Sequence, residues 1–199
     1  MEKAISKIFY LNKRVVFPYC TINILFAITK TAREIELGDR IIAYPIRNML
    51  DMIFYRNKLG TLSEVIEVEQ HEKSVSIQLK GIERVKIKKI DKFQDSRFEM
   101  VTEEQPESLD DLKEELKKKT QELIFLINVE ESDKLIYLLN YFINMKQITD
   151  FIAHYFVLDF SRRYRLFNEL NIEKRTLSLL SIIDVLIRDI NKKRGAAVL

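Results

Sequence analysis

Residues that could perform acid–base or metal chemistry are few in this 199-residue sequence and lie far apart. Its one cysteine, Cys20, and its two histidines, His71 and His154, lack the close spacing from which zinc sites normally draw their ligands. Asp110 and Asp111 are adjacent carboxylates, but they stand at a predicted helix start, where the helix dipole favours negative charge. We therefore interpret these acids as structural and assign no catalytic residue and no metal ligand.

The phosphate-binding and nucleophile motifs of common enzymes are also missing. A P-loop ends in Gly-Lys-Ser or Gly-Lys-Thr, yet none of the four glycines is followed by lysine. Neither GxSxG nor GxGxxG occurs. His154 lies in an apolar helical segment and is predicted to be hydrogen-bonded and partly buried, whereas His71 lies in a polar turn. An active site is poorly supported, and no cofactor is expected.

Composition favours a folded protein with little net charge. Hydrophobic residues make up 47% of the chain, which is enough for a sizeable core, and the net charge is only +3. Dedicated nucleic-acid domains usually show a larger, clustered basic excess. A single cysteine cannot form an internal disulfide, and the most apolar stretch, residues 151–158, is too short to span a bilayer. We expect a cytoplasmic protein without a membrane partner.

The first half of the chain is predicted to be a β domain. Apolar residues alternate with period two, and turn signals separate the runs. Gly81 interrupts the alternation, as expected of a bulge. Many short strands without long helices favour an antiparallel, barrel-like fold. The predicted strands cover residues 15–17, 22–28, 41–44, 60–68 and 74–79, with alternation resuming at 85–87.

The second half is predicted to be a bundle of four or five helices. The composition changes at residues 103–108, so we place one domain at 1–105 and another at 106–199. The helix beginning near Ser132 is apolar on almost every side and is predicted to be central. In the last helix, Leu177 and Ile183 belong to an apolar stripe that bundle packing explains, with oligomerisation as the alternative. The helical patterns cover residues 109–127, 132–143, 146–156, 161–170 and 173–192.

Several separated segments carry recognisable patterns in a fixed order. One segment leads through paired valines to Phe-Pro, another reads Gly-Asp-Arg, and a third is a strand with Gly and Arg three residues apart. The segments are residues 8–18, 22–26, 38–42, 59–66, 79–87, 148–154, 166–171 and 173–175. In this order they resemble the amino-terminal substrate-recognition domain of Lon, the ATP-dependent protease, although Tyr19 replaces the family's usual glycine and Lys80 its usual acid. The resemblance implies an α+β fold, a PUA-like antiparallel β pseudo-barrel followed by an α-helical bundle.

The same resemblance implies a function. It predicts a non-catalytic module that binds unfolded or damaged polypeptides for Lon-type proteolysis, and association with the Lon ATPase–protease or with itself. The sequence ends at Leu199 without an ATPase part or a Ser–Lys peptidase part, so this chain alone is not expected to be an enzyme. Both a fragment of a larger protease and a stand-alone relative fit these observations.

Binding of unfolded clients requires exposed apolar or aromatic side chains, because such clients differ from folded proteins mainly by their exposed hydrophobic groups. Two methionines among the candidates are flexible enough to suit varied partners. The alternative is that these side chains pack the core of the barrel. The candidate substrate-binding residues are Phe17, Tyr19, Met49, Met52, Phe54 and Tyr55.

RNA binding is the alternative function, because PUA-like folds often occur in RNA-binding proteins. Arg84, Lys86, Lys88 and Lys89 place positive charge along one predicted strand, with Arg84 on the face of Lys86 and Lys88. RNA recognition favours aromatic platforms between such cations, and Phe93 is the only aromatic residue nearby. We interpret this stretch as a solvated strand face and do not expect nucleic acid to be the partner.

Overall fold

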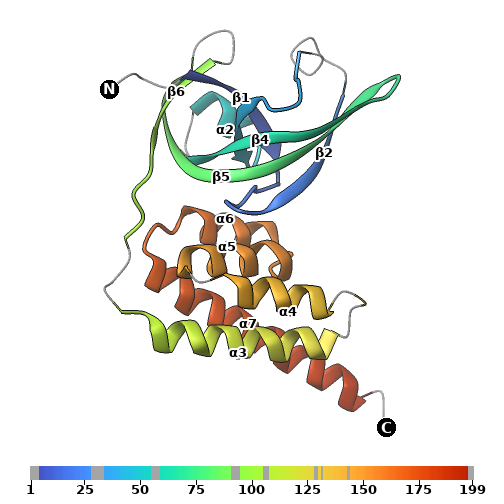
Figure 1. Cartoon of the computed structure of the whole chain (residues 1–199), viewed down its shortest axis with the longest axis vertical. Coiled ribbons are helices and arrows are strands. Elements are labelled where there is room, and N and C mark those ends of the chain that lie inside the picture. The colour runs from blue at the N-terminus through green and yellow to red at the C-terminus, as the bar shows by residue number, and fades with distance from the viewer. Residues whose placement is uncertain are drawn as a thin grey trace. The chain divides into compact units, whose positions relative to one another are not determined.

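The computed structural model describes residues 5–27, 34–54, 59–90, 95–104, 108–127, 130, 132–142 and 144–196 (Figure 1). The chain divides into two compact units, Met1–Thr102 and Glu103–Leu199, which we call the β unit and the helical unit.

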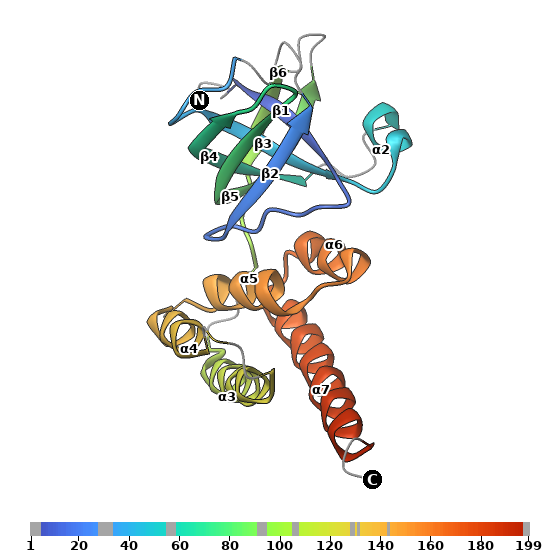
Figure 2. The same ribbon diagram turned by 90° about the vertical axis from the view of Figure 1, so that its right-hand side faces the viewer.

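Among its described residues, the β unit is a six-stranded sheet with one short helix. Its order is β2-β5-β4-β3-β1-β6, and β6 also pairs with the end of β5, so the sheet curls into a barrel-like form (Figure 2). The expected fold class is confirmed, although one pairing, β1 with β3, is parallel. The elements are β1 (Ile5–Asn12), β2 (Thr21–Ala27), β3 (Arg40–Ile46), α2 (Met49–Phe54), β4 (Leu59–Gln70), β5 (Ser74–Ile90) and β6 (Asp95–Met100).

The core of the β unit lies on both sides of β3. Ile41 and Ala43 join a cluster that includes Ile77, whereas Ile42 and Tyr44 join a second cluster. A strand buried on both faces needs consecutive apolar residues instead of alternation, and β3 has them. The same need for core packing explains residues 15–17, where the predicted strand is wrong. They form a buried loop without ladder partners.

The predicted bulge at Gly81 is confirmed. Leu62 faces Glu83 and Ser63 faces Gly81, so β5 has one extra residue at this point. A Cβ atom on Gly81 would lie 2.3 Å from the carbonyl oxygen of Phe17. Only glycine therefore allows the loop before β2 to approach β5 this closely.

The helical unit contains five helices among its described residues. The longest, α7, contacts α3, α5 and α6, and α4 packs beside α3 (Figure 2). No helix among the described residues combines the length and apolar character needed to cross a membrane. The helices are α3 (Asp110–Ile127), α4 (Ser132–Tyr141), α5 (Met145–Phe156), α6 (Phe160–Asn168) and α7 (Ile172–Ala196).

The prediction that the helix beginning near Ser132 is central is wrong. In α4 only Leu139 is buried, and Tyr137 and Tyr141 are exposed. The buried helix is α5, of whose twelve residues eight are buried. Tyrosines explain why α4 is exposed although its sequence is largely apolar. A tyrosine ring can cover a neighbouring surface while its hydroxyl group stays in water.

Candidate functional site

The six predicted substrate-binding residues do not form one described surface patch. Phe17 is fully buried, Met52 is half-buried against the second core cluster, and Tyr19 is 37% exposed. Met49 and Phe54 belong to α2, but their side chains, like the whole of Tyr55, lie outside the described residues. Of this set, the structure places the ring of Tyr19 within reach of a partner.

Tyr19 lies in a turn that is held in an unusual backbone conformation. Its φ angle is 64°, in the left-handed region that favours glycine. Its backbone N–H donates to the carbonyl of Gly81 at 2.8 Å, and the N–H of Gly81 donates to the carbonyl of Cys20 at 2.9 Å. The glycine that the Lon resemblance predicts here would adopt this conformation without strain. A tyrosine in its place is a candidate for function, since strained residues persist where the surrounding structure holds them.

The basic stretch of β5 is only partly available to a phosphate. The loop of residues 15–17 covers β5 at Arg84. A hydrogen bond holds the loop there, because Thr61 of β4, which pairs with Arg84 in the sheet, donates its hydroxyl to the carbonyl of Val16 at 2.6 Å. The Arg84 guanidinium carbon lies 6.0 Å from the centre of the Phe17 ring, and the residue is fully buried. The prediction that Arg84 joins an exposed basic face is therefore wrong.

The lysines of the same stretch do lie at the surface. Lys86, Lys88 and Lys89 are exposed. Lys88 forms an ion pair with Glu99 of β6 at 2.6 Å, which offsets its charge. The strand face that carries these lysines is thus weakly basic, in agreement with a solvated strand face.

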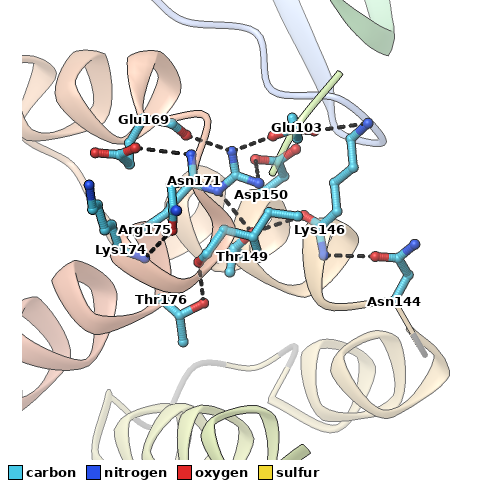
Figure 3. A network of polar contacts seen from close by, with 11 residues as sticks. Glu103, Asn144, Lys146, Thr149, Asp150, Glu169, Asn171, Lys174, Arg175 and Thr176 are labelled. Carbon is cyan, nitrogen blue, oxygen red and sulfur yellow. Dashed lines mark hydrogen bonds and ion pairs between the residues drawn. The ribbon is translucent and has the colours of Figure 1, made fainter. Parts of the chain in front are cut away.

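A buried polar network in the helical unit surrounds Arg175 of α7 (Figure 3). Its Nη1 donates to Glu103 Oε1 at 2.6 Å and to the carbonyl of Glu169 at 3.1 Å, and its Nε donates to Thr149 Oγ1 at 3.1 Å. Asp150 Oδ1 lies 3.9 Å from its Nη2. These contacts fix the start of the helical unit to α5 and α7, and we assign the network a structural role.

His154 has the environment that the sequence predicted. It is half-buried on α5, and its Nδ1 lies 3.3 Å from Arg163 Nη2. Burial, and secondarily the positive charge of Arg163, lower the pKa of His154 to about 4. The imidazole is therefore neutral near pH 7, and its Nδ1 accepts from the guanidinium. Within the described ranges, no group of three or more His, Cys, Asp or Glu could hold a metal ion.

Five aromatic rings form a continuous row along α4 and α5, which sequence reasoning missed. From Tyr137 the row passes through Tyr141, Phe142 and Phe151 to Tyr155, with successive ring centres 6.4, 6.2, 5.4 and 4.8 Å apart. Tyr137 is 67% exposed, Tyr141 69% and Tyr155 43%, whereas Phe151 is buried. We call these five residues the aromatic row. The sequence does contain a sign of the aromatic row. Positions 137, 141 and 155 are tyrosines, where a buried helix would carry leucine or phenylalanine.

A groove of about 890 Å³ lies between α6 and α7 of the helical unit. Leu177, at which the sequence predicted bundle packing, is half exposed and contributes to the groove. Two arginines of α6 stand at its edge. The lining residues are Arg162, Tyr164, Arg165, Leu166, Asn168, Glu169, Leu177, Ser178, Ser181, Ile182 and Val185.

Comparison with known proteins assigns the fold. Residues 6–185 match the family model of the ATP-dependent protease La (LON) substrate-binding domain. The N-terminal domain of the Lon protease of the Mycobacterium avium complex superposes with a TM-score of 0.69 and 14% identity, over 91% of this chain and 98% of that chain. The Lon N-terminal domain protein of Xanthomonas campestris superposes with a TM-score of 0.54 and 13% identity, over 89% of this chain and 98% of that chain. No curated protein matches the sequence.

Proposed function

The chain belongs to the family of LON substrate-binding domains, and we propose that it recognises unfolded or damaged polypeptides for Lon-type ATP-dependent proteolysis. The family supports the role of a substrate-binding module, which is not itself catalytic. The nature of the substrate is the part that we propose. Association with a Lon ATPase–protease, or with further copies of this chain, belongs to the same proposal.

The observation that carries the proposal is the aromatic row. Isolated exposed apolar residues are normal on protein surfaces, whereas a contiguous row that reaches the surface at both ends provides a binding area. Tyr137 and Tyr141 stack with an angle of 24° between their rings and are both exposed. Tyrosine rings offer large contact areas at low cost in conformational entropy, which suits the binding of varied apolar side chains.

Tyr19 supports the same proposal from the β unit. Its strained backbone holds an aromatic ring at the surface of a tight turn, where glycine would remove the ring. We propose Tyr19 as a second contact for clients, together with the half-buried Met52 and with Met49, Phe54 and Tyr55 of the sequence prediction. Phe17 stabilises the turn from within.

The test is a titration of the 199-residue chain with a fluorescently labelled, permanently unfolded protein, with its native form as the reference. We expect saturable binding of the unfolded form that persists at high salt, because apolar contacts are not screened. The double variant Tyr137→Ser/Tyr141→Ser should weaken binding about tenfold, as expected for the loss of two aromatic contacts.

A matched control separates the aromatic row from exposed apolar area in general. Leu25 and Leu37 are exposed in the β unit, and the variant Leu25→Ser/Leu37→Ser should bind the unfolded protein normally. Equal loss in both double variants, or equal binding of native and unfolded protein, would contradict the proposal.

RNA binding has weaker support, because Arg84 is buried and Lys88 is paired with Glu99. A labelled RNA titrated in parallel at two salt concentrations tests it. Binding to RNA alone, with an affinity that falls steeply as salt rises, would replace our proposal, because such a fall indicates phosphate contacts.

A further inference from the structure

We propose that the groove between α6 and α7 binds peptide segments in which carboxylates stand beside apolar side chains. This inference rests on the proposed function and specifies one class of client segment. It concerns a surface of the helical unit that neither the aromatic row nor Tyr19 belongs to.

The edge of the groove is positively charged. Helix α6 contains three arginines and no acidic residue, and Arg162 and Arg165 lie three positions apart, on one side of the helix. Arg163 is directed elsewhere, to the ring of His154. Among the ion pairs of the described residues, neither Arg162 nor Arg165 has a carboxylate partner, so both can reach an anionic ligand.

The acids near this edge are already engaged. The side chain of Asp159 caps α6 by accepting the backbone N–H of Arg162 at 2.8 Å. Glu169 lines the groove, but its Oε1 accepts the backbone N–H of Asn171 at 3.0 Å. The groove thus offers two guanidinium groups against the one carboxylate of Glu169, and this positive excess favours a ligand with negative charge.

Helix α7 forms an apolar wall of the groove that is partly exposed to solvent. Leu177 is 50% exposed, and Ile182 and Val185 are half-buried, so apolar carbon remains for a ligand to cover. Between them, Ser178 and Ser181 are small and leave room, and the hydroxyl of Ser178 donates to the carbonyl of Lys174 within its own helix. A ligand that fills this wall must carry apolar side chains.

These two requirements together define the partner. A purely apolar segment would leave Arg162 and Arg165 without an ion pair, and a purely anionic ligand would leave Leu177 and Ile182 uncovered. Segments of unfolded proteins that combine Leu or Phe with Asp or Glu satisfy both. Basic segments would be repelled, so the groove would discriminate among clients by charge.

The experiment uses three labelled twelve-residue peptides with the same Leu and Phe positions and with Glu, Gln or Lys at the remaining positions. Fluorescence anisotropy with the full chain should show the tightest binding for the Glu peptide and none for the Lys peptide. Arg162→Glu/Arg165→Glu should weaken binding of the Glu peptide roughly tenfold. Leu177→Ser should weaken the Glu and Gln peptides alike.

The control is Lys80→Glu/Lys118→Glu, which changes the net charge equally on exposed residues of β5 and α3 that do not line the groove. It should leave Kd within about twofold, and circular dichroism should show that every variant is folded. Arg162→Gln/Arg165→Gln should give an intermediate loss.

Equal binding of the Glu and Lys peptides would overturn the inference, and so would an equal loss of binding in both charge-reversal variants. It would also be overturned if the chain preferred a single-stranded RNA and Arg162→Glu/Arg165→Glu abolished that binding. Failure here is distinct from failure of the proposed function. An unfolded protein that still binds through Tyr137 and Tyr141, while no peptide binds the groove, would refute this inference alone.

Discussion

The two units hold their irregular segments in place by different means. In the β unit the loop before β2 rests on the bulge of β5, backbone against backbone: Tyr19 and Cys20 exchange hydrogen bonds with Gly81, and the carbonyl of Phe17 occupies the space of an absent Cβ. In the helical unit the segment at Glu103 is held by side chains, through the buried guanidinium of Arg175.

This difference determines what each unit tolerates. A contact between backbones depends on the size of one residue and on one left-handed turn, and it does not respond to charge. A contact through buried ions depends on both partners, since removing one leaves the other charged and out of water. The β unit should therefore be sensitive to small changes in shape, and the helical unit to changes in charge and in pH.

The largest effect is expected from Arg175→Met. Methionine keeps much of the side-chain volume, but Asp150 and Glu103 lose the guanidinium beside them. Glu103 still pairs with Lys146 at 2.8 Å, so we expect the lower part of the range of about 3–5 kcal/mol that breaking a buried pair costs. Hydrogen exchange followed by mass spectrometry should show faster exchange in residues 103–196 and unchanged exchange in the β unit. The exposed neighbour Lys174→Met serves as the control. Unchanged protection in the helical unit would refute the role of the network.

Gly81→Ala should produce the corresponding loss in the β unit. The new Cβ would overlap the Phe17 carbonyl, so the loop must move and its hydrogen bonds weaken, at a cost of about 2–4 kcal/mol. Gly60→Ala is the comparison, because its Cβ would approach the side-chain atom Cγ2 of Ile42 at 2.7 Å and no backbone atom closer than 3.3 Å. Chemical denaturation should rank Gly81→Ala well below Gly60→Ala in stability, and the reverse order would contradict the backbone contact.

Acid should weaken the helical unit through His154. Its pKa falls from 6.5 to about 4 on folding, so between these values the unfolded chain binds a proton that the folded chain does not. The contribution to the free energy of unfolding is full above about pH 6.5, declines as pH falls, and levels off near pH 4, a change on the order of 2–3 kcal/mol.

The variant His154→Gln isolates this contribution. Its stability should fall less steeply than that of the wild type between pH 6.5 and 4, as measured by denaturation at each pH. Lys118→Gln, at an exposed position of α3, should follow the wild type. Identical slopes for wild type and His154→Gln would show that His154 is not responsible.

The smallest effect concerns the left-handed turn. At position 19 the glycine variant should be more stable than the alanine variant by about 1 kcal/mol, because φ of 64° disfavours any residue with a Cβ. Because both variants lack the tyrosine ring, their difference in stability reports the backbone conformation alone. At the exposed helical position Lys174 the order should reverse, with alanine the more stable by about 1 kcal/mol. Equal stability of Tyr19→Gly and Tyr19→Ala would mean that the turn relaxes.

Local patterns in the sequence determined much of the fold. Alternation predicted the strands around Val75 and Ile77, helical spacing predicted the helices of the second half, and the interruption at Gly81 predicted the bulge. Each of these depends on residues close together in the chain, where the periods of strand and helix act directly. The ordered segments that resemble Lon also pointed to the family before any contact was known.

Tertiary structure alone decided which of these residues face solvent. Arg84 has the strand position that its sequence predicts, yet Phe17, in a loop much earlier in the chain, covers it. The apolar helix α4 lies beside α3 and exposes Tyr137, and Leu177 of the apolar stripe opens into a groove. The period of a segment fixes which residues share a face, but burial depends on what packs against that face, and that partner comes from elsewhere in the chain.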